Sequence, residues 1–520
     1  MGKIIEKIID QFDLGMTQDP RISNERFSQL IKNFEAHTFI RKLVPLHEQD
    51  NGDSSAATNK IQNFTIAGYV GVPPTDYRLF GLGVSGTKAR VFVNASFISS
   101  TWTSHATASA MTAVDFELFI YYPKTRRLYG ASDGSLIWSC DPVSGGSGFD
   151  ETDGNDEFAH TLATSYRNPR SSSSGNRPNI SGLVHSKDDI MYIGYDNIIV
   201  SNDGSGDWTD PALTLPVDMV ITSLSEYGNY LAIGVKSANE IGGSLVLLWD
   251  RNSTANDISE KIDWGEGNLQ ILEEIDGVLI GVSIAGTTIT QVLSKITFRY
   301  YAGGKPVVFK QFISEANYTS NNLPRYKRKV NNYLYFPMKI KLNDSTQEGI
   351  WKVGRHVGSG QFMVSIERAP NNDTDLTSGE IHGFIKNGDI MFIAYTDNGV
   401  LAMTATDISG DDSASSIYES LIFGDQRKKF KLIAAGVMTE AMPSNGQIIL
   451  GYKKDEETSY TTIFTNGTDS DIYHEAVNIE SSGDTLPEFR EISFQIKSTG
   501  GAVLTGLYFK AEEISNNPSS

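Results

Sequence analysis

Hydrophobic and polar residues alternate in short runs from Ile61 onward, which predicts strands and not helices. Several runs of about five mostly apolar residues follow a polar, turn-forming pair, an arrangement typical of β-hairpins. The pairs are Asp188-Asp189, Gly228-Asn229, Asp276-Gly277, Asn331-Asn332 and Asn387-Gly388. They recur at intervals of about 40 to 56 residues, and repeats of that length with several strands each are typical of a β-propeller.

The pattern therefore predicts an all-β chain with a β-propeller of about six to eight blades over residues 46–514. Residues 488–514 alternate apolar and polar side chains as a closing hairpin, and residues 515–520 are expected to form a flexible tail. We expect the hairpin to pair with an early strand, because strands from both ends of the chain then close the ring without a free sheet edge. The two ends of the chain would lie close together.

Residues 1–45 differ from the rest and are expected to form a short helix followed by a polar, hook-like arm. Apolar residues at helical spacing predict one amphipathic helix that ends near Gly15. They are Ile4, Ile5, Ile8, Ile9 and Phe12. A helix this short is unstable alone, so its apolar face must form a contact with another surface. That surface is either the chain's own propeller or a neighbouring subunit in an assembly.

Composition and charge restrict the partners. The chain has 520 residues and a net charge of −19, with ordinary hydrophobic (39%) and charged (21%) fractions for a globular protein. Gripping nucleic-acid phosphates needs an excess of Lys and Arg, so the charge suits a conduit for DNA better than a clamp. The one cysteine, Cys140, excludes an internal disulfide and is expected to be a buried thiol.

The sequence has neither a recognisable signal peptide nor an apolar stretch of the roughly 18 residues that a membrane span needs. We therefore expect no membrane span and synthesis in a cytoplasm.

The most specific motif is “SNDGSGDW” at residues 201–208, which resembles the Asp-box hairpin of propeller proteins. Ser201, Asp203 and Trp208 match the pattern, whereas Ser205 and Asp207 stand where it prefers Gly and Thr. A short Asp side chain accepts backbone N–H bonds in such a turn, and the Trp packs against a neighbouring strand. We expect an outer hairpin turn with a structural role, not a catalytic one.

No catalytic or metal-binding motif is recognisable among the eight histidines, the glycine-rich loops or the acidic residues. The acidic run at 150–157 lacks the spaced ligands of an EF-hand loop. We therefore interpret it as a solvated acidic loop in preference to a Ca²⁺-binding site. We therefore expect no enzyme activity, no catalytic residue, no metal and no cofactor.

Two basic clusters are interpreted either as solvated faces or as charges that pair with an acidic partner subunit. They comprise Arg325, Lys327, Arg328 and Lys329, and Arg427, Lys428, Lys429 and Lys431.

The stretch from Ile8 to Glu48 resembles the start of tailed-bacteriophage virion proteins, which have a Gly-x-x-x-Asp-Pro/Lys-Arg hook, an Asn-Phe-Asp/Glu element and a Leu-x-Pro element. The matching residues are Gly15, Asp19, Pro20, Arg21, Asn33, Phe34, Glu35, Leu43 and Pro45. The C-terminal hairpin is similar to the closing hairpin of these proteins. The resemblance implies a structural virion protein of the tail, of nozzle or tail-hub type, with a role in DNA ejection.

The resemblance also implies a homo-oligomeric ring around the DNA channel, other tail proteins as partners, and at most passive contact with genomic DNA. Docking of the face made by Ile4, Ile5, Ile8, Ile9 and Phe12 on a neighbouring subunit would be the assembly contact. The alternative is a propeller-based host-attachment lectin or glycan-active enzyme. Four tryptophans expected in or near loops keep this alternative open, because they can form a sugar platform: Trp102, Trp208, Trp264 and Trp351.

Overall fold

The chain folds as two compact units, each described by itself in this computed structural model. The sandwich unit comprises Met1–Gln49, Leu342–Asp375 and Asp407–Ser520, and the propeller unit comprises Asp50–Lys341 and Leu376–Thr406. The described residues form strands and no helix. They are 3–18, 24–51, 59–70, 76–85, 88–94, 101–112, 116–132, 136–142, 160–161, 180–205, 208–237, 243–252, 258–285, 294–314, 326–342, 345–370, 379–398, 400–407, 415–467, 472–477 and 486–514.

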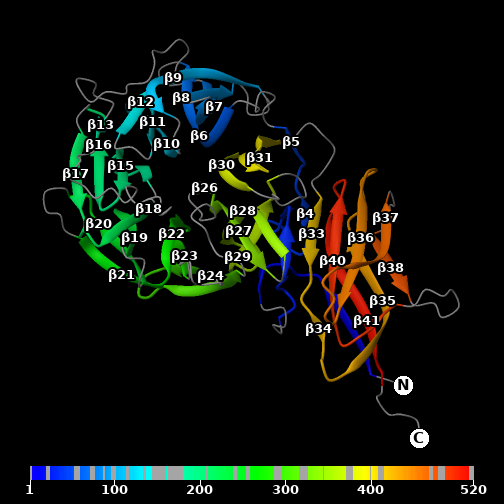
Figure 1. The fold of residues 1–520 in the computed structure, drawn as a ribbon. Coiled ribbons are helices and arrows are strands. Elements are labelled where there is room, and N and C mark those ends of the chain that lie inside the picture. Colours follow the sequence, from blue (N-terminus) through cyan, green and yellow to red (C-terminus); the bar gives the residue numbers. More distant parts are fainter. Residues whose placement is uncertain are drawn as a thin grey trace, which may run out of the picture. The chain divides into compact units, whose positions relative to one another are not determined.

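The propeller unit consists of small antiparallel sheets that follow one another along the chain and around a ring (Figure 1). Three four-stranded sheets contain β6 (Asn59–Val70), β7 (Asp76–Ser85), β8 (Lys88–Asn94) and β9 (Trp102–Thr112); β10 (Phe116–Tyr122), β11 (Arg127–Ser132), β12 (Leu136–Cys140) and β13 (His160–Thr161); and β14 (Ser181–His185), β15 (Ile190–Tyr195), β16 (Ile198–Asn202) and β17 (Trp208–Thr214).

Three further four-stranded sheets of the propeller unit repeat this arrangement, and one pair of strands, β26 and β27, accompanies them. They contain β18 (Met219–Tyr227), β19 (Tyr230–Ser237), β20 (Gly243–Trp249) and β21 (Ile258–Glu266); β22 (Asn268–Ile275), β23 (Val278–Ala285), β24 (Ser294–Tyr301) and β25 (Val307–Ser314); the hairpin of β26 (Arg328–Val330) and β27 (Tyr333–Leu342); and β30 (Gly379–Asn387), β31 (Ile390–Asp397) and β32 (Val400–Thr406) with β5 (Gln49–Asn51). The prediction of an all-β propeller is confirmed.

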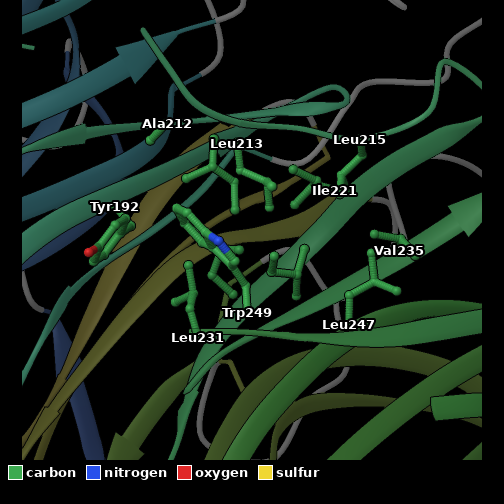
Figure 2. Packing of buried hydrophobic residues seen from close by; sticks show 12 residues of the cluster. Tyr192, Ala212, Leu213, Leu215, Ile221, Leu231, Val235, Leu247 and Trp249 are labelled. Atoms are coloured by element: carbon green, nitrogen blue, oxygen red, sulfur yellow. The ribbon is translucent and has the colours of Figure 1, made fainter. Parts of the chain in front are cut away.

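Neighbouring sheets of this unit share hydrophobic cores. Figure 2 shows one such core, in which Tyr192 of β15 lies against Trp249 of β20 with ring centroids 5.9 Å apart. The ring closes in the same way, because Trp102 of β9 packs edge-on against Phe392 of β31 at 5.7 Å. Packing of the β30–β32 sheet on the β6–β9 sheet therefore joins the two ends of the propeller, without help from the C-terminal hairpin.

The predicted turn pairs lie in tight turns between strands. Asp276 and Gly277 both have positive φ angles, as a two-residue hairpin turn of the mirror-image type requires. Asp189, Gly228, Asn331 and Gly388 also have positive φ. Cys140 is fully buried at the end of β12, as expected.

The sandwich unit consists of two larger sheets and a short hairpin. One sheet has the order β1-β41-β35-β38, with β39 also pairing with β35: β1 (Ile4–Ile9), β41 (Leu504–Ile514), β35 (Lys429–Thr439), β38 (Tyr473–Val477) and β39 (Glu488–Phe489). The other contains β28 (Ser345–Arg355), β29 (Phe362–Arg368), β2 (Leu30–Lys32), β33 (Ser416–Glu419), β40 (Glu491–Thr499), β36 (Gln447–Lys454), β37 (Thr461–Gly467) and β34 (Phe423–Gly424). The hairpin is β3 (Phe34–Glu35) and β4 (Val44–Pro45).

Aromatic rings fill the space between the two larger sheets of the sandwich unit. Phe509 of β41 lies 5.1 Å from Phe494 of β40 and 4.9 Å from Phe423 of β34, measured between ring centroids. Because β41 and β40 belong to different sheets, these contacts hold the sheets face to face, as in a β-sandwich.

The N-terminal helix predicted from the sequence is wrong, because residues Ile4–Ile9 form strand β1. Four of these six residues are isoleucine, whose branched side chain loses rotamer freedom in a helix and packs well on a sheet. Strand β1 pairs antiparallel with β41, from Ile4 opposite Glu512 to Ile9 opposite Leu507. An edge of a sheet thus stabilises a segment that is too short to be stable alone.

The predicted pairing of the C-terminal hairpin with an early strand is confirmed by β1 and β41, which bring the two ends of the described chain together. The hairpin lies in the sandwich unit, however, so the structure divides the chain differently from the predicted boundary at residues 45 and 46. Residues 515–520, the predicted tail, lie outside the described residues.

Candidate assembly surface

Strand β1 distributes four of the five predicted contact residues over two faces. Ile4 and Ile8 point outward and are 53% and 54% exposed. Ile5 is half-buried, whereas Ile9 is buried on the inner face. Phe12, beyond the strand, is also buried and packs edge-on against Tyr418 with ring centroids 5.2 Å apart. The two-residue period of a strand has therefore replaced the helical stripe, and only Ile4 and Ile8 remain free for an assembly contact.

Apolar residues of two other strands extend this outer face, which we call the β1 face. In the sheet register Ile8 lies opposite Tyr508 of β41, and the Tyr508 ring lies 6.4 Å from Tyr473 of β38. Tyr473 lies two positions before Glu475 in β38, and Val477 lies two positions after it. Their side chains are 44% and 49% exposed. Since directly opposed residues share a face, the β1 face comprises Ile4, Ile8, Tyr473, Val477 and Tyr508.

Charged residues of both signs lie among these apolar groups. Glu6 of β1 stands opposite Lys510 of β41 in the register. Burial, followed by the negative charges of Glu6 and Glu475, raises the pKa of Tyr508. Burial and a hydrogen bond to Glu475 likewise raise the pKa of Tyr473. The two phenols therefore remain neutral donors at physiological pH, which suits an amphipathic contact surface.

The sequence alone does not identify Tyr473, Val477 and Tyr508 as members of this surface. The signal was the alternation in “DIYHEAV” and “GLYFKAEEI”, but no local pattern shows that these strands lie in one sheet with β1.

The residues that carry the N-terminal resemblance are used within the sandwich unit. Gly15 has a φ of +68°, and a Cβ there would lie 2.8 Å from the Val364 carbonyl oxygen, so only glycine fits. The buried Asn33 side chain donates to the Ser415 carbonyl at 2.9 Å and accepts the Ala369 N–H at 2.8 Å. Phe34 and Leu43 are fully buried. Asp19, Pro20 and Arg21 lie outside the described residues.

Glu35, another of these residues, takes part in a buried ion-pair group. The Lys352 ammonium lies 2.6 Å from a Glu35 carboxylate oxygen and 3.2 Å from one of Glu367. Burial alone would lower the pKa of Lys352, but the two carboxylates raise it above its usual value. The buried imidazole of His37 nearby has a pKa well below its usual value, first because of burial and then because of the Lys352 charge. This ion-pair group connects β3 to β28 and β29, and we interpret its role as structural.

The described residues of the Asp-box segment, 201–205 and 208, belong to β16, to β17 or to the connection between them, at the outer edge of their sheet, and Asp207 lies outside the described residues. Asp203 accepts the Ser205 backbone N–H at 2.8 Å, and Ser201 belongs to β16. Trp208 is half-buried and packs edge-on against Tyr129 of the neighbouring sheet, with ring centroids 6.1 Å apart. The segment is thus a hairpin turn whose tryptophan bridges two sheets.

The described residues of the first basic cluster form ion pairs and hydrogen bonds within the propeller unit. Lys327 forms an ion pair of 2.8 Å with Glu273 and donates to the Leu224 carbonyl at 2.6 Å. Arg328 donates to the Phe64 carbonyl, and Lys329 pairs with Glu274 at 2.5 Å. These cations therefore connect β26 and the residues before it to β6, β18 and β22. Arg325 lies outside the described residues.

The second basic cluster lies on the surface of the sandwich unit. Lys428 pairs with Glu513 at 3.0 Å, and Lys429 pairs with Glu488. Each of these lysine side chains is almost half exposed.

The tryptophans and the possible metal ligands lie as follows in the described residues. Trp102, Trp264 and Trp351 are strand residues with buried side chains, so their rings are not exposed for stacking on a sugar. Within the described ranges no group of three or more His, Cys, Asp and Glu side chains has metal-site geometry. The acidic run at 150–157 lies outside those ranges. The described residues contain no helix that is long and apolar enough to cross a membrane.

Comparisons with known proteins give only remote likenesses. No protein-family description matches the chain, and no curated protein matches it. Similar solved structures include Raptor from Chaetomium thermophilum, with 13% identity, a TM-score of 0.42, and 69% of this chain and 30% of that chain covered. This chain therefore spans less than a third of the Raptor chain.

Two further solved structures have similar folds. The WD40 domain of Toxoplasma gondii coronin has 11% identity and a TM-score of 0.43, with 73% of this chain and 87% of that chain covered. The exo-β-1,3-galactanase of Phanerochaete chrysosporium has 9% identity and a TM-score of 0.33, with 89% of this chain and 100% of that chain covered.

Proposed function

We propose that the protein is a structural, non-enzymatic component of a tailed-phage virion, a nozzle-type or tail-hub-type tail protein that forms a homo-oligomeric ring around the DNA channel. The observation that carries this proposal is the β1 face, where Ile4, Ile8, Tyr473 and Val477 remain exposed beside Tyr508. Clustered apolar side chains on an outer sheet face are typical of protein interaction sites. The N-terminal resemblance to virion proteins supports the choice of setting.

The energetics of the β1 face suit an assembly contact. Complete burial of an isoleucine side chain contributes about 1.5–3 kcal/mol, and Ile4 and Ile8 each have about half of their surface left to bury. Together with the two tyrosines and Val477, this contribution is large enough to offset part of the entropy that association costs. A ring repeats the contact at every subunit, so that a modest contact suffices.

The net charge of −19 supports passage of DNA through such a ring without tight binding. A channel wall that is neutral or acidic repels phosphates, whereas an excess of Lys and Arg would hold them.

The decisive experiment replaces Ile4 and Ile8 together with Asp and measures particle mass by light scattering. We expect the wild type to form a ring and the double variant to remain a folded monomer that fails to enter virions. The matched control is Val307→Asp with Val308→Asp on β25, because these valines are 46% and 50% exposed and lie in the propeller unit. The control should assemble as the wild type does.

Ile9 is not suitable for this test, because Ile9→Asp would place a carboxylate in the sandwich core and unfold the unit. An Ile4/Ile8 variant that assembles normally would contradict the proposed contact. A wild-type chain that is monomeric and cleaves or binds glycans would instead favour the host-attachment alternative.

A further inference from the structure

A second feature of the sandwich unit lies on the inner side of the sheet that carries the β1 face. A cavity of about 380 Å³ opens there between strands of the two sheets. This volume falls in the range of pockets that bind small molecules. Its lining includes Ile5, Ala511 and the rings of Phe423, Phe430, Phe489 and Phe509.

One part of the cavity wall is aromatic, and charged residues make up much of the rest. Phe430 and Phe489 stack with ring centroids 5.6 Å apart, and Phe423 packs against Phe509 at 4.9 Å. Phe430, Phe489 and Phe509 are all buried, so their rings are held in place by packing on their other sides. Such fixed rings form a preformed surface for a hydrocarbon or aromatic group.

The charged groups of the lining are mostly occupied with one another. Lys7 pairs with Glu25, and Lys428 pairs with Glu513 at 3.0 Å. Asp425 accepts the backbone N–H of Arg427 at 2.9 Å and so stabilises its own turn.

Lys3 differs from these groups. Its side chain is exposed, and in the described part of the chain no carboxylate forms an ion pair with its ammonium group. The lining therefore combines an aromatic wall with a lysine, Lys3, that forms no ion pair with a described carboxylate.

We propose that this cavity binds a small amphiphilic monoanion, with its apolar body against the phenylalanine rings and its carboxylate or equivalent head beside Lys3. Transfer of the apolar body from water to the cavity supplies the driving force, and the lysine selects the charge of the head. The site is distinct from the β1 face, because Ile5 and Ala511 point to the opposite side of the sheet from Ile4 and Ile8. The proposal therefore does not depend on the phage assignment.

The test is calorimetric titration of the full chain with decanoate, decanol and decyltrimethylammonium. These probes share an apolar chain and differ in the charge of the head. We expect saturable binding that is tightest for decanoate and weakest for the cation. Decanoate that shows no saturable binding, or binds no more tightly than the cation, would overturn the proposal.

Two kinds of variant locate the site. Ala511→Phe, or Ile5→Trp at the more exposed edge strand, fills the cavity and should abolish binding of decanoate and decanol alike. Lys3→Gln should weaken the binding of decanoate by about fivefold, the effect expected of an exposed ion pair. The affinity for decanol should stay unchanged. Lys510→Gln on the same strand as Ala511 is the matched control, because Lys510 belongs to the opposite face, and it should bind as the wild type does.

Circular dichroism of each variant shows whether it is folded. If the folded Ile5→Trp variant binds decanoate with unchanged affinity, the cavity is not the site. Equal decanoate affinity of the Lys3→Gln variant and the wild type would overturn the assignment of the anionic head.

Discussion

The propeller unit and the sandwich unit differ in how they use apolar and charged residues. In the propeller unit, tryptophans such as Trp102 and Trp264 are buried in the cores between neighbouring sheets. The Lys327 cluster forms its contacts within the same unit. In the sandwich unit both ends of the chain form one sheet, whose outer face keeps Ile4 and Ile8 exposed and whose inner side borders a cavity. Among the described residues, the propeller unit closes on itself, whereas the sandwich unit has the exposed apolar face and the cavity.

The largest expected effect that tests this comparison comes from deletion of residues 486–520. The deletion removes β40 and β41, which are interior strands of the two sandwich sheets, and it leaves β1 without its partner. We expect the sandwich unit to unfold while the propeller unit keeps its structure, because the propeller closes through Trp102 and Phe392. Differential scanning calorimetry should show one transition lost and one retained.

The control for this deletion is a chain that ends at residue 514, which removes no described strand. It should melt as the full chain does. A deletion of 486–520 that melts like the full chain, or one that unfolds the propeller unit as well, would contradict the independence of the two units.

A smaller effect is expected within the propeller, where two tryptophans differ in burial. Trp249 is fully buried in the core between the β14–β17 and β18–β21 sheets, so Trp249→Ala should lower the free energy of unfolding by about 3–5 kcal/mol. Trp208 is half-buried against Tyr129, and Trp208→Ala should cost about half as much. Urea unfolding measures both values. A larger loss for Trp208 than for Trp249 would show that the Asp-box hairpin carries more of the stability than its packing indicates.

The sequence was sufficient to predict the parts of the fold that depend on local pattern. Two-residue alternation and turn pairs such as Asp276-Gly277 predicted the strands, and their spacing predicted the propeller. The Asp-box motif predicted a hairpin turn with Trp208 against a neighbouring sheet. These features depend on contacts between residues close in the chain or on a regular repeat.

The features that the sequence did not predict depend on pairing between distant segments. The stripe from Ile4 to Phe12 fits a helix and a strand almost equally well, and only its pairing with β41, about 500 residues away, decides for the strand. The same pairing decides which isoleucines are exposed. The charge clusters show a similar limit, because nothing near Lys327 in the sequence identifies Glu273 as its partner.

The smallest expected effects separate the basic cluster of the propeller from that of the sandwich. Lys327 and Glu273 are mostly buried, so Lys327→Met should leave the Glu273 carboxylate without its partner and cost about 2–3 kcal/mol. Lys428 is almost half exposed, and Lys428→Met should cost about 0.5 kcal/mol or less, because solvent screens its pairing with Glu513.

Double-mutant cycles with Glu273→Gln and Glu513→Gln measure the two coupling energies by urea unfolding. Added salt should reduce the coupling at Lys428 more than at Lys327, because buried pairs are screened less. Equal coupling energies would show that the propeller cluster is as solvated as the sandwich cluster and would remove this difference between the units.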